Sequence, residues 1–113
     1  MIQSRCATCK HNSNCIPGDG PHPARVMLVG EAPGRDEDRL GRPFVGATGQ
    51  EFDRTYLPLA GLDRAEVYVT NTRLCRPDLN RKPTDREARD CAQHHLPQEL
   101  AEVCPEVVVL MGG

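Results

Sequence analysis

Apolar residues gather in three short runs that are separated by longer polar segments. The runs cover residues 26–29, 67–69 and 107–111, and each is rich in valine. Runs of this length and composition predict buried strands. The intervening segments are long enough for helices, so the pattern predicts a βαβαβ order with a parallel sheet and right-handed crossovers.

Helical signals lie between the predicted strands. Apolar residues recur at helical spacing in segment 49–62, which predicts an amphipathic helix that packs on the sheet and ends at Gly61. Its apolar positions are Phe52, Tyr56, Leu59 and Ala60. A capping signal at Thr84 predicts a second helix that runs to about Val103. The mixed charges of residues 35–39 predict a solvated loop or turn.

The first strand leads directly into the sequence VGEAPG, followed by GRPFVG at residues 41–46. Two glycines and a proline stop the strand and allow a sharp turn. This turn brings Glu31 and Phe44 to the carboxyl end of the strand, where open α/β sheets bind their ligands. The alternative is a plain strand–helix connection with an incidental glutamate, and this stretch alone does not exclude it.

Size and composition indicate one small domain with a modest core. The chain has 113 residues, of which 38% are hydrophobic, with ten prolines and ten glycines. Its mean hydropathy of -0.53 is low for a well-packed domain. A structural staple, a partner or additional chain would stabilise such a protein.

Positive charge is concentrated locally although the net charge is only -2. Between residues 70 and 83, four cations face a single acid, Asp78. The four are Arg73, Arg76, Arg81 and Lys82. If the protein binds DNA, we expect this side to bind it, because phosphates attract clustered cations.

The six cysteines are interpreted as metal ligands. Residues 1–5 lack the apolar core of an export signal, and no apolar run reaches membrane-spanning length. We therefore expect a cytoplasmic protein with no membrane partner, a setting in which disulfides are rare. Cys15 is a spare thiol or an alternative ligand, and Cys104 fits a small buried hydrophobe.

Four cysteines from two distant segments form the candidate metal site. Cys6 and Cys9 make a CxxC pair, whereas Cys75 and Cys91 are separated by fifteen residues. Four thiolates suit zinc and an iron–sulfur cluster equally well. The alternative is that these thiols are buried only as small hydrophobes.

Taken together, four segments resemble the uracil-DNA glycosylase superfamily, and most of all its iron–sulfur branch, family 4. They are CATC, VGEAPGRDEDRLGRPFVGATGQ, VYVTNTRLCRPDLNRKP and the C-x15-C that ends at Cys91. Their order and the spacing from Glu31 to Phe44 agree with the family pattern. The resemblance implies a three-layer α/β/α domain over residues 1–113, with about three strands here, a cluster-binding arm at 1–24 and a core at 25–113.

The resemblance further implies an enzyme of DNA base excision repair, expected as a monomer, that hydrolyses the N-glycosidic bond of uracil in deaminated DNA after base flipping. It implies a [4Fe-4S] cluster on the four cysteines of the candidate metal site, with zinc as the alternative metal. Glu31 would handle water, Phe44 would stack on the flipped uracil, and Asn71 would read its edge. The remaining substrate-binding residues would be Gly30, Ala32 and Asn80.

The chain departs from the family pattern in two places. The family has a further strand and a loop with a His-Pro-Ser-like motif, to which nothing here corresponds. His94 and His95 precede the third strand, and we expect them on a solvated or packed helix face. Asp78 stands where the family usually has a proline. These departures leave the alternative of an iron–sulfur DNA-binding module with weak or no catalysis, as a fragment or a reduced relative. The cysteines by themselves also leave open a zinc-stapled domain of unrelated function.

Overall fold

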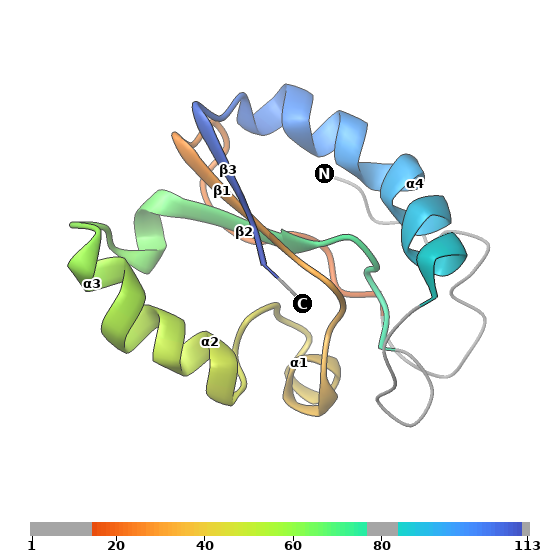
Figure 1. The fold of residues 1–113 in the computed structure, drawn as a ribbon, viewed down its shortest axis with the longest axis horizontal. Coiled ribbons are helices and arrows are strands. Elements are labelled where there is room, and N and C mark those ends of the chain that lie inside the picture. Colours follow the sequence, from red (N-terminus) through yellow and green to blue (C-terminus); the bar gives the residue numbers. More distant parts are fainter. Residues whose placement is uncertain (1–14, 77–83, 112–113) are drawn as a thin grey trace.

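The computed structural model describes residues 15–76 and 84–111 (Figure 1). Within them, the three predicted strands form one parallel sheet in the order β2-β1-β3. Central strand β1 spans Val26–Gly30, β2 spans Val67–Asn71, and β3 spans Val107–Leu110. The predicted parallel α/β fold is therefore confirmed.

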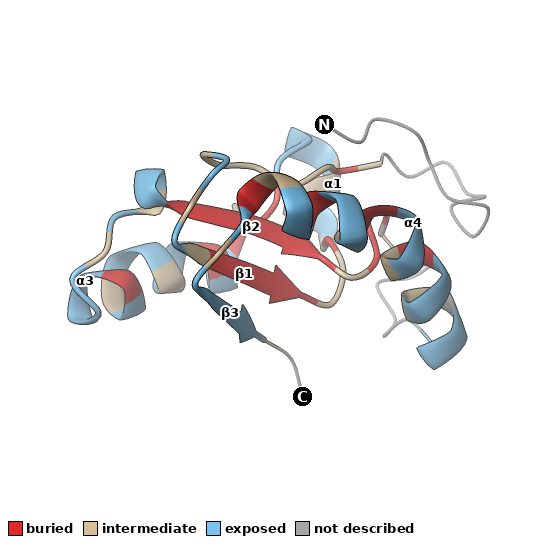
Figure 2. Ribbon diagram, turned by 90° about the horizontal axis from the view of Figure 1, so that it is seen from above, coloured by how far each residue is buried: buried red, intermediate tan, exposed pale blue. Residues whose placement is uncertain are grey.

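The sheet is covered on both faces, which makes three layers (Figure 1). Leu28, Val67 and Val69 pack with Leu57 on one face. Met27, Val29 and Tyr68 pack on the other with Val103, the last residue of helix α4 (Asp85–Val103). Alternate residues of a strand point to opposite faces, so both sets come from the same short strands. The core therefore lies on both sides of β1 and β2 (Figure 2).

Helix α4 spans Asp85–Val103, close to its predicted bounds, and contains Pro97. None of the helices in the described part of the chain has the length and apolar character that crossing a bilayer requires.

The edges of the sheet differ. Segment 15–19 runs antiparallel beside β2, where Asp19 pairs with Val69 through two backbone hydrogen bonds of 2.8 and 2.9 Å. Strand β3 forms the opposite edge, and its four side chains are 38–78% exposed. The best-buried part of the sheet is therefore the β1–β2 pair (Figure 2).

The helical segment after β1 has a different register from the predicted one. It consists of α2 (Ala47–Glu51), the π-helical turn η1 (Phe52–Tyr56) and α3 (Leu57–Leu59). The Leu57 N–H bonds the carbonyl of Phe52, five residues earlier. This wider turn moves the buried position by one residue, because a π-turn inserts an extra residue per turn.

The prediction that Tyr56, Leu59 and Ala60 pack on the sheet is consequently wrong. Tyr56 is 57% exposed and Leu59 is 81% exposed, and Ala60 is also exposed, whereas Leu57 is only 3% exposed. The predicted end at Gly61 is confirmed, since this residue has φ = 73°.

The π-helical register predicts unequal effects of two neighbouring substitutions. Leu57→Ala should lower the free energy of unfolding by about 2–5 kcal/mol, because it opens a cavity in the core. Tyr56→Ala should lower it by less than about 1 kcal/mol, because that ring lies largely in solvent. Urea denaturation of both variants measures the difference, and equal losses would contradict the register.

Candidate active site

The carboxyl ends of β1 and β2 lie side by side and bring three predicted site residues into contact. The parallel register pairs Gly30 with Asn71. A Cβ atom added to Gly30 would lie 2.6 Å from Asn71 Oδ1 and 2.8 Å from Phe44 Cζ. The amide of Asn71 and the ring of Phe44 therefore both lie against the bare backbone of Gly30.

Asn71 offers a buried amide at this edge. It is the last residue of β2 and is 4% exposed. Among the described residues, none hydrogen-bonds its side chain. A buried amide group normally finds partners, and an Asn side chain has both donors and an acceptor. The arrangement is therefore suited to a polar ligand.

Phe44 has a backbone conformation that is unusual for a bulky residue. Its φ is 57°, in the left-handed region, and its side chain is partly buried against the β1–β2 core. The loop passes so close to α2 that a Cβ atom at Gly49 would lie 2.1 Å from the Phe44 carbonyl oxygen. A glycine at position 49 is thus required for this loop path.

Glu37 fixes the same loop by accepting three backbone hydrogen bonds. One carboxylate oxygen bonds the N–H groups of Val45 (3.0 Å) and Gly46 (2.7 Å). The other bonds the N–H of Gly34 (3.0 Å) at the start of α1, which spans Arg35–Leu40. The expectation of a loop at residues 35–39 is therefore wrong. The capping spacing from Gly34 to Glu37, with acidic residues in the first turn, was the available signal.

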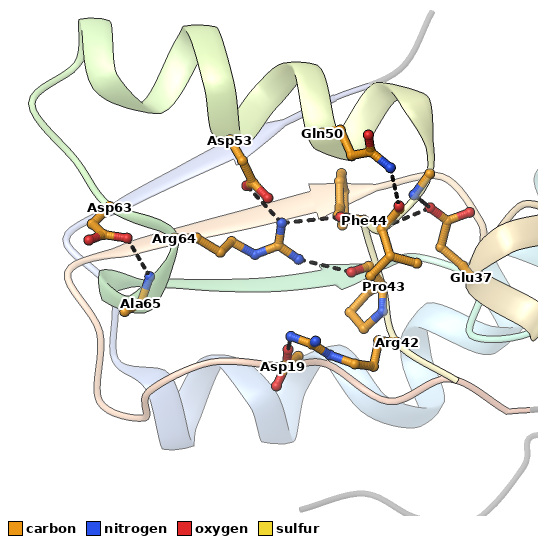
Figure 3. A network of polar contacts seen from close by, with 12 residues as sticks. Asp19, Glu37, Arg42, Pro43, Phe44, Gln50, Asp53, Asp63, Arg64 and Ala65 are labelled. Carbon is orange, nitrogen blue, oxygen red and sulfur yellow. Dashed lines mark hydrogen bonds and ion pairs between the residues drawn. The ribbon is translucent and has the colours of Figure 1, made fainter. Parts of the chain in front are cut away.

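Arg64 approaches the loop from the opposite side (Figure 3). It lies in the short 3-10 helix η2, Arg64–Glu66, which precedes β2. Its guanidinium donates to the carbonyls of Pro43 (2.9 Å) and Phe44 (3.2 Å), and to Asp53 (2.9 Å). The sequence carries no local signal for this residue, because Arg64 is separated from Phe44 by twenty positions and belongs to no motif.

Glu31 is held at the end of β1 through its backbone. Its carbonyl accepts hydrogen bonds from the Arg73 N–H (3.0 Å) and the Thr72 hydroxyl (2.9 Å). Glu31 and Ala32 are both half-buried and enter the loop that begins α1. Glu31 therefore lies at the carboxyl end of β1, where the sequence predicted it.

A buried polar network lies behind this edge, on the α4 face of the sheet. His95 and Glu99 are 0% and 2% exposed, and His95 Nδ1 contacts the Glu99 carboxylate. Glu99 also accepts hydrogen bonds from the hydroxyls of Tyr68 (2.5 Å) and Thr70 (3.3 Å). His95 therefore occupies the packed face of its helix, whereas His94 is exposed.

The network links α4 to the strand end that carries the site. His95 Nε2 lies 2.9 Å from the Thr72 carbonyl. Because a carbonyl oxygen can only accept, Nε2 carries the hydrogen of this contact. Burial and the bond to Glu99 raise the pKa of the Tyr68 hydroxyl well above its usual range, so it remains a donor.

Two of the four predicted cluster ligands meet in one buried corner. Cys75 and Cys91 are each 1% exposed and form a small core with Leu74, against which Cys15 packs. The N–H of Leu74 donates to Cys91 Sγ at 3.2 Å. Cys75 is disulfide-bonded in this structure. Cys104 lies elsewhere and is exposed, so its expected burial as a small hydrophobe is wrong.

The described residues contain no group of three or more Cys, His, Asp and Glu arranged to hold a metal ion. Cys6 and Cys9 lie outside these residues. Cys91, whose sulfur accepts the Leu74 N–H, is suited to ligate as a thiolate, and Cys75 would become a second donor beside it once its disulfide is reduced.

One predicted DNA-contacting residue is placed in the interior. Arg73 is 0% exposed, and its Nε donates to the Cys75 carbonyl at 3.2 Å. Its assignment to a DNA-facing surface is therefore wrong, because the fold uses this arginine to support the cysteine segment. Arg76 is half-buried. Asn80, Arg81 and Lys82 lie outside the described residues.

Residues 17–113 match the model of the uracil DNA glycosylase superfamily. The chain belongs to this superfamily. It is similar to a protein of Archaeoglobus fulgidus named type-4 uracil-DNA glycosylase, with 44% identity over 112 residues, covering 99% of this chain and 55% of the relative. A protein of the same name from Sulfurisphaera tokodaii is 38% identical over 108 residues, covering 96% of this chain and 49% of the relative.

A type-5 uracil-DNA glycosylase of Thermus thermophilus matches a shorter part, with 37% identity over 91 residues, covering 69% of this chain and 41% of the relative. The resemblance to the superfamily, and most of all to its type-4 branch, is confirmed. The chain spans about half the length of the curated relatives it matches.

Adding a methyl group at Gly30 and at Gly49 should distinguish a glycine that shapes the candidate site from a glycine that the fold requires. Gly30→Ala meets the ends of two side chains rather than backbone, so we expect it to lower the free energy of unfolding by less than Gly49→Ala does. The NMR signals of the Asn71 amide and the Phe44 ring should nevertheless shift. Gly49→Ala meets the Phe44 backbone and should cost about 1–3 kcal/mol. Unchanged NMR signals in Gly30→Ala would contradict the contact.

The buried Tyr68 hydroxyl predicts a loss of stability at high pH. Its pKa is higher in the folded protein than the value of about 10 in an unfolded chain. The contribution of the neutral Tyr68 hydroxyl to the free energy of unfolding is therefore complete below pH 10. It declines as the pH rises further, by up to about 1.4 kcal/mol per pH unit. Urea denaturation between pH 8 and 11 should show this component in the native protein and not in Tyr68→Phe. Parallel curves for the two proteins would contradict it.

Proposed function

We propose that this chain forms the uracil-recognition part of a uracil-DNA glycosylase, which hydrolyses the N-glycosidic bond between uracil and deoxyribose in DNA. One observation carries the proposal: an aromatic ring, Phe44, and a buried amide, Asn71, converge on Gly30 at the carboxyl edge of a parallel sheet. Membership of the superfamily and the names of the relatives support the same activity.

The two side chains suit a flipped pyrimidine. A base within a duplex cannot be reached, so the enzyme must extrude it and compensate for the lost stacking. The Phe44 ring provides a stacking surface, and such contacts contribute about 1–3 kcal/mol per base. Asn71 can donate to a uracil carbonyl and accept from the imide N–H. Cytosine has the opposite pattern at this edge and would leave polar groups unpaired.

Glu31 is proposed as the catalytic carboxylate, with Gly30 and Ala32 lining the base site. Cleavage passes through an oxocarbenium-like sugar while negative charge develops on the departing uracil. A carboxylate at the end of β1 can orient the attacking water or stabilise the cation. The alternative role for Glu31 is to hold the loop through backbone N–H groups. Fixed donors near the uracil carbonyls, such as the Asn71 amide, stabilise the developing charge.

The DNA strand is proposed to contact the segment that follows β2. Arg76, Asn80, Arg81 and Lys82 supply three cations and an amide within seven positions of one another. Cations in this segment would hold the phosphates on either side of the flipped nucleotide.

The cofactor is proposed to be a [4Fe-4S] cluster on Cys6, Cys9, Cys75 and Cys91, with zinc as the alternative. Bound there, it would act as a structural tie between distant segments. The buried pair Cys75 and Cys91, and the Leu74 N–H that bonds the Cys91 sulfur, support a thiolate site. Cys75 must be reduced to serve as a ligand. Absorbance near 400 nm after anaerobic purification would indicate iron–sulfur, and bound zinc without colour would indicate the alternative.

The activity is tested by uracil release from a single-stranded oligonucleotide that contains one uracil. Asn71→Ala should lower the single-turnover rate about 10²–10³-fold, as loss of a preorganised donor does. Glu31→Gln should also lower it. Leu59→Ala, an exposed position on α3, is the matched control and should leave the rate unchanged.

Two results would overturn parts of this proposal. No release by the native protein, together with salt-dependent DNA binding, would favour the non-catalytic DNA-binding module. Release that Glu31→Gln leaves untouched would remove Glu31 from the mechanism without affecting the activity itself.

A further inference from the structure

Phe44 has a backbone conformation that a bulky residue does not adopt without support from its surroundings. A non-glycine residue at φ = 57° is uncommon, and a bulky one persists there only when its surroundings impose the conformation. The question is therefore which contacts impose it. Two side chains from outside the loop, Glu37 and Arg64, hold its backbone.

Arg64 holds the acceptor side of the loop. Its two terminal nitrogens donate to the consecutive carbonyls of Pro43 (2.9 Å) and Phe44 (3.2 Å). Two carbonyls presented together match the planar fork of a guanidinium, which a single ammonium cannot reproduce. The Arg64 side chain is 20% exposed, so these bonds are largely shielded from competing water.

Asp53 and the ring itself fix the guanidinium in turn. The carboxylate of Asp53, on η1, lies 2.9 Å from the same nitrogen that bonds Phe44 (Figure 3). The guanidinium carbon lies over the Phe44 ring, 5.9 Å from its centroid, within the range of cation–π attraction. Arg64 thus contacts both the backbone and the aromatic face of the residue.

Glu37 holds the backbone N–H groups of the loop. Its carboxylate accepts hydrogen bonds from the N–H groups of Val45 and Gly46. The loop backbone around Phe44 is therefore held through both kinds of group, the carbonyls of Pro43 and Phe44 by a cation and the N–H groups of Val45 and Gly46 by an anion. Such a loop keeps one conformation without a ligand, so the binding of a base costs little further conformational entropy.

We infer that Arg64 is a positioning residue for base capture: with Asp53 as its support, it presets the Phe44 ring as a platform for the flipped uracil. The inference rests on the proposed function and deepens it. Arg64 touches neither substrate nor reacting atoms in this scheme. Its effect reaches the reaction only through Phe44.

A double-mutant cycle between positions 64 and 44 tests this dependence. With Phe44 present, Arg64→Ala should lower kcat/KM for uracil release at least about tenfold, and Arg64→Lys should restore little of it. With Phe44→Ala, the same changes at position 64 should have less than a twofold effect. Arg54→Ala, an exposed arginine on the same helical turn as Asp53, is the control and should leave kcat/KM unchanged.

The cycle distinguishes this inference from its alternatives. Equal losses with and without the Phe44 ring would mean that Arg64 serves only the fold, and the inference would be wrong. Arg64→Lys retains the aliphatic stem and decides the question if Arg64→Ala does not fold, as judged by its thermal unfolding. Absence of uracil release by the native protein would overturn the proposed function instead, and release that Phe44→Ala leaves unchanged would overturn the stacking role.

Discussion

The contact on which the rest of the site depends is the close approach of Asn71 and Phe44 to the bare Cα of Gly30. Parallel strands that end level bring their last residues side by side, and here those residues are Gly30 and Asn71. A side chain at position 30 would occupy the space into which the amide and the ring converge. The missing side chain at position 30 is therefore what lets a polar and an aromatic side chain approach the same stretch of backbone at this sheet edge.

Two kinds of polar contact make that edge rigid from opposite sides of the sheet. On one side, Glu37 and Arg64 hold the Phe44 loop by its N–H and carbonyl groups. On the other, the His95–Glu99 pair bonds the Thr72 carbonyl and ties α4 to the end of β2. Buried polar groups are costly unless they are satisfied, so such groups specify one arrangement when they are. The candidate site thus lies between two polar networks, one around Phe44 and one around His95 and Glu99, and both support a single arrangement of this sheet edge.

The sequence predicted what depends on local pattern and missed what depends on distant partners. Runs of valine identified all three strands, and the capping signal at Thr84 located α4. The family resemblance alone implied that Phe44 and Asn71 serve one base, and the structure brings both side chains against Gly30. Arg64 could not be recognised, since its partners are backbone carbonyls twenty positions away. Arg73 was misassigned because a basic segment alone does not reveal which cation the fold buries.

The segment from Asn71 to Cys75 joins the proposed base site to the buried corner of Cys75 and Cys91 within five residues. Arg73 lies between them, and its backbone N–H bonds the Glu31 carbonyl while its Nε bonds the Cys75 carbonyl. A displacement of Cys75 would therefore be transmitted to Glu31 through Arg73, which is buried and bonds both carbonyls. A structural centre on these cysteines would need to do no chemistry to matter, because the position of its ligand sets the backbone that carries the proposed catalytic carboxylate.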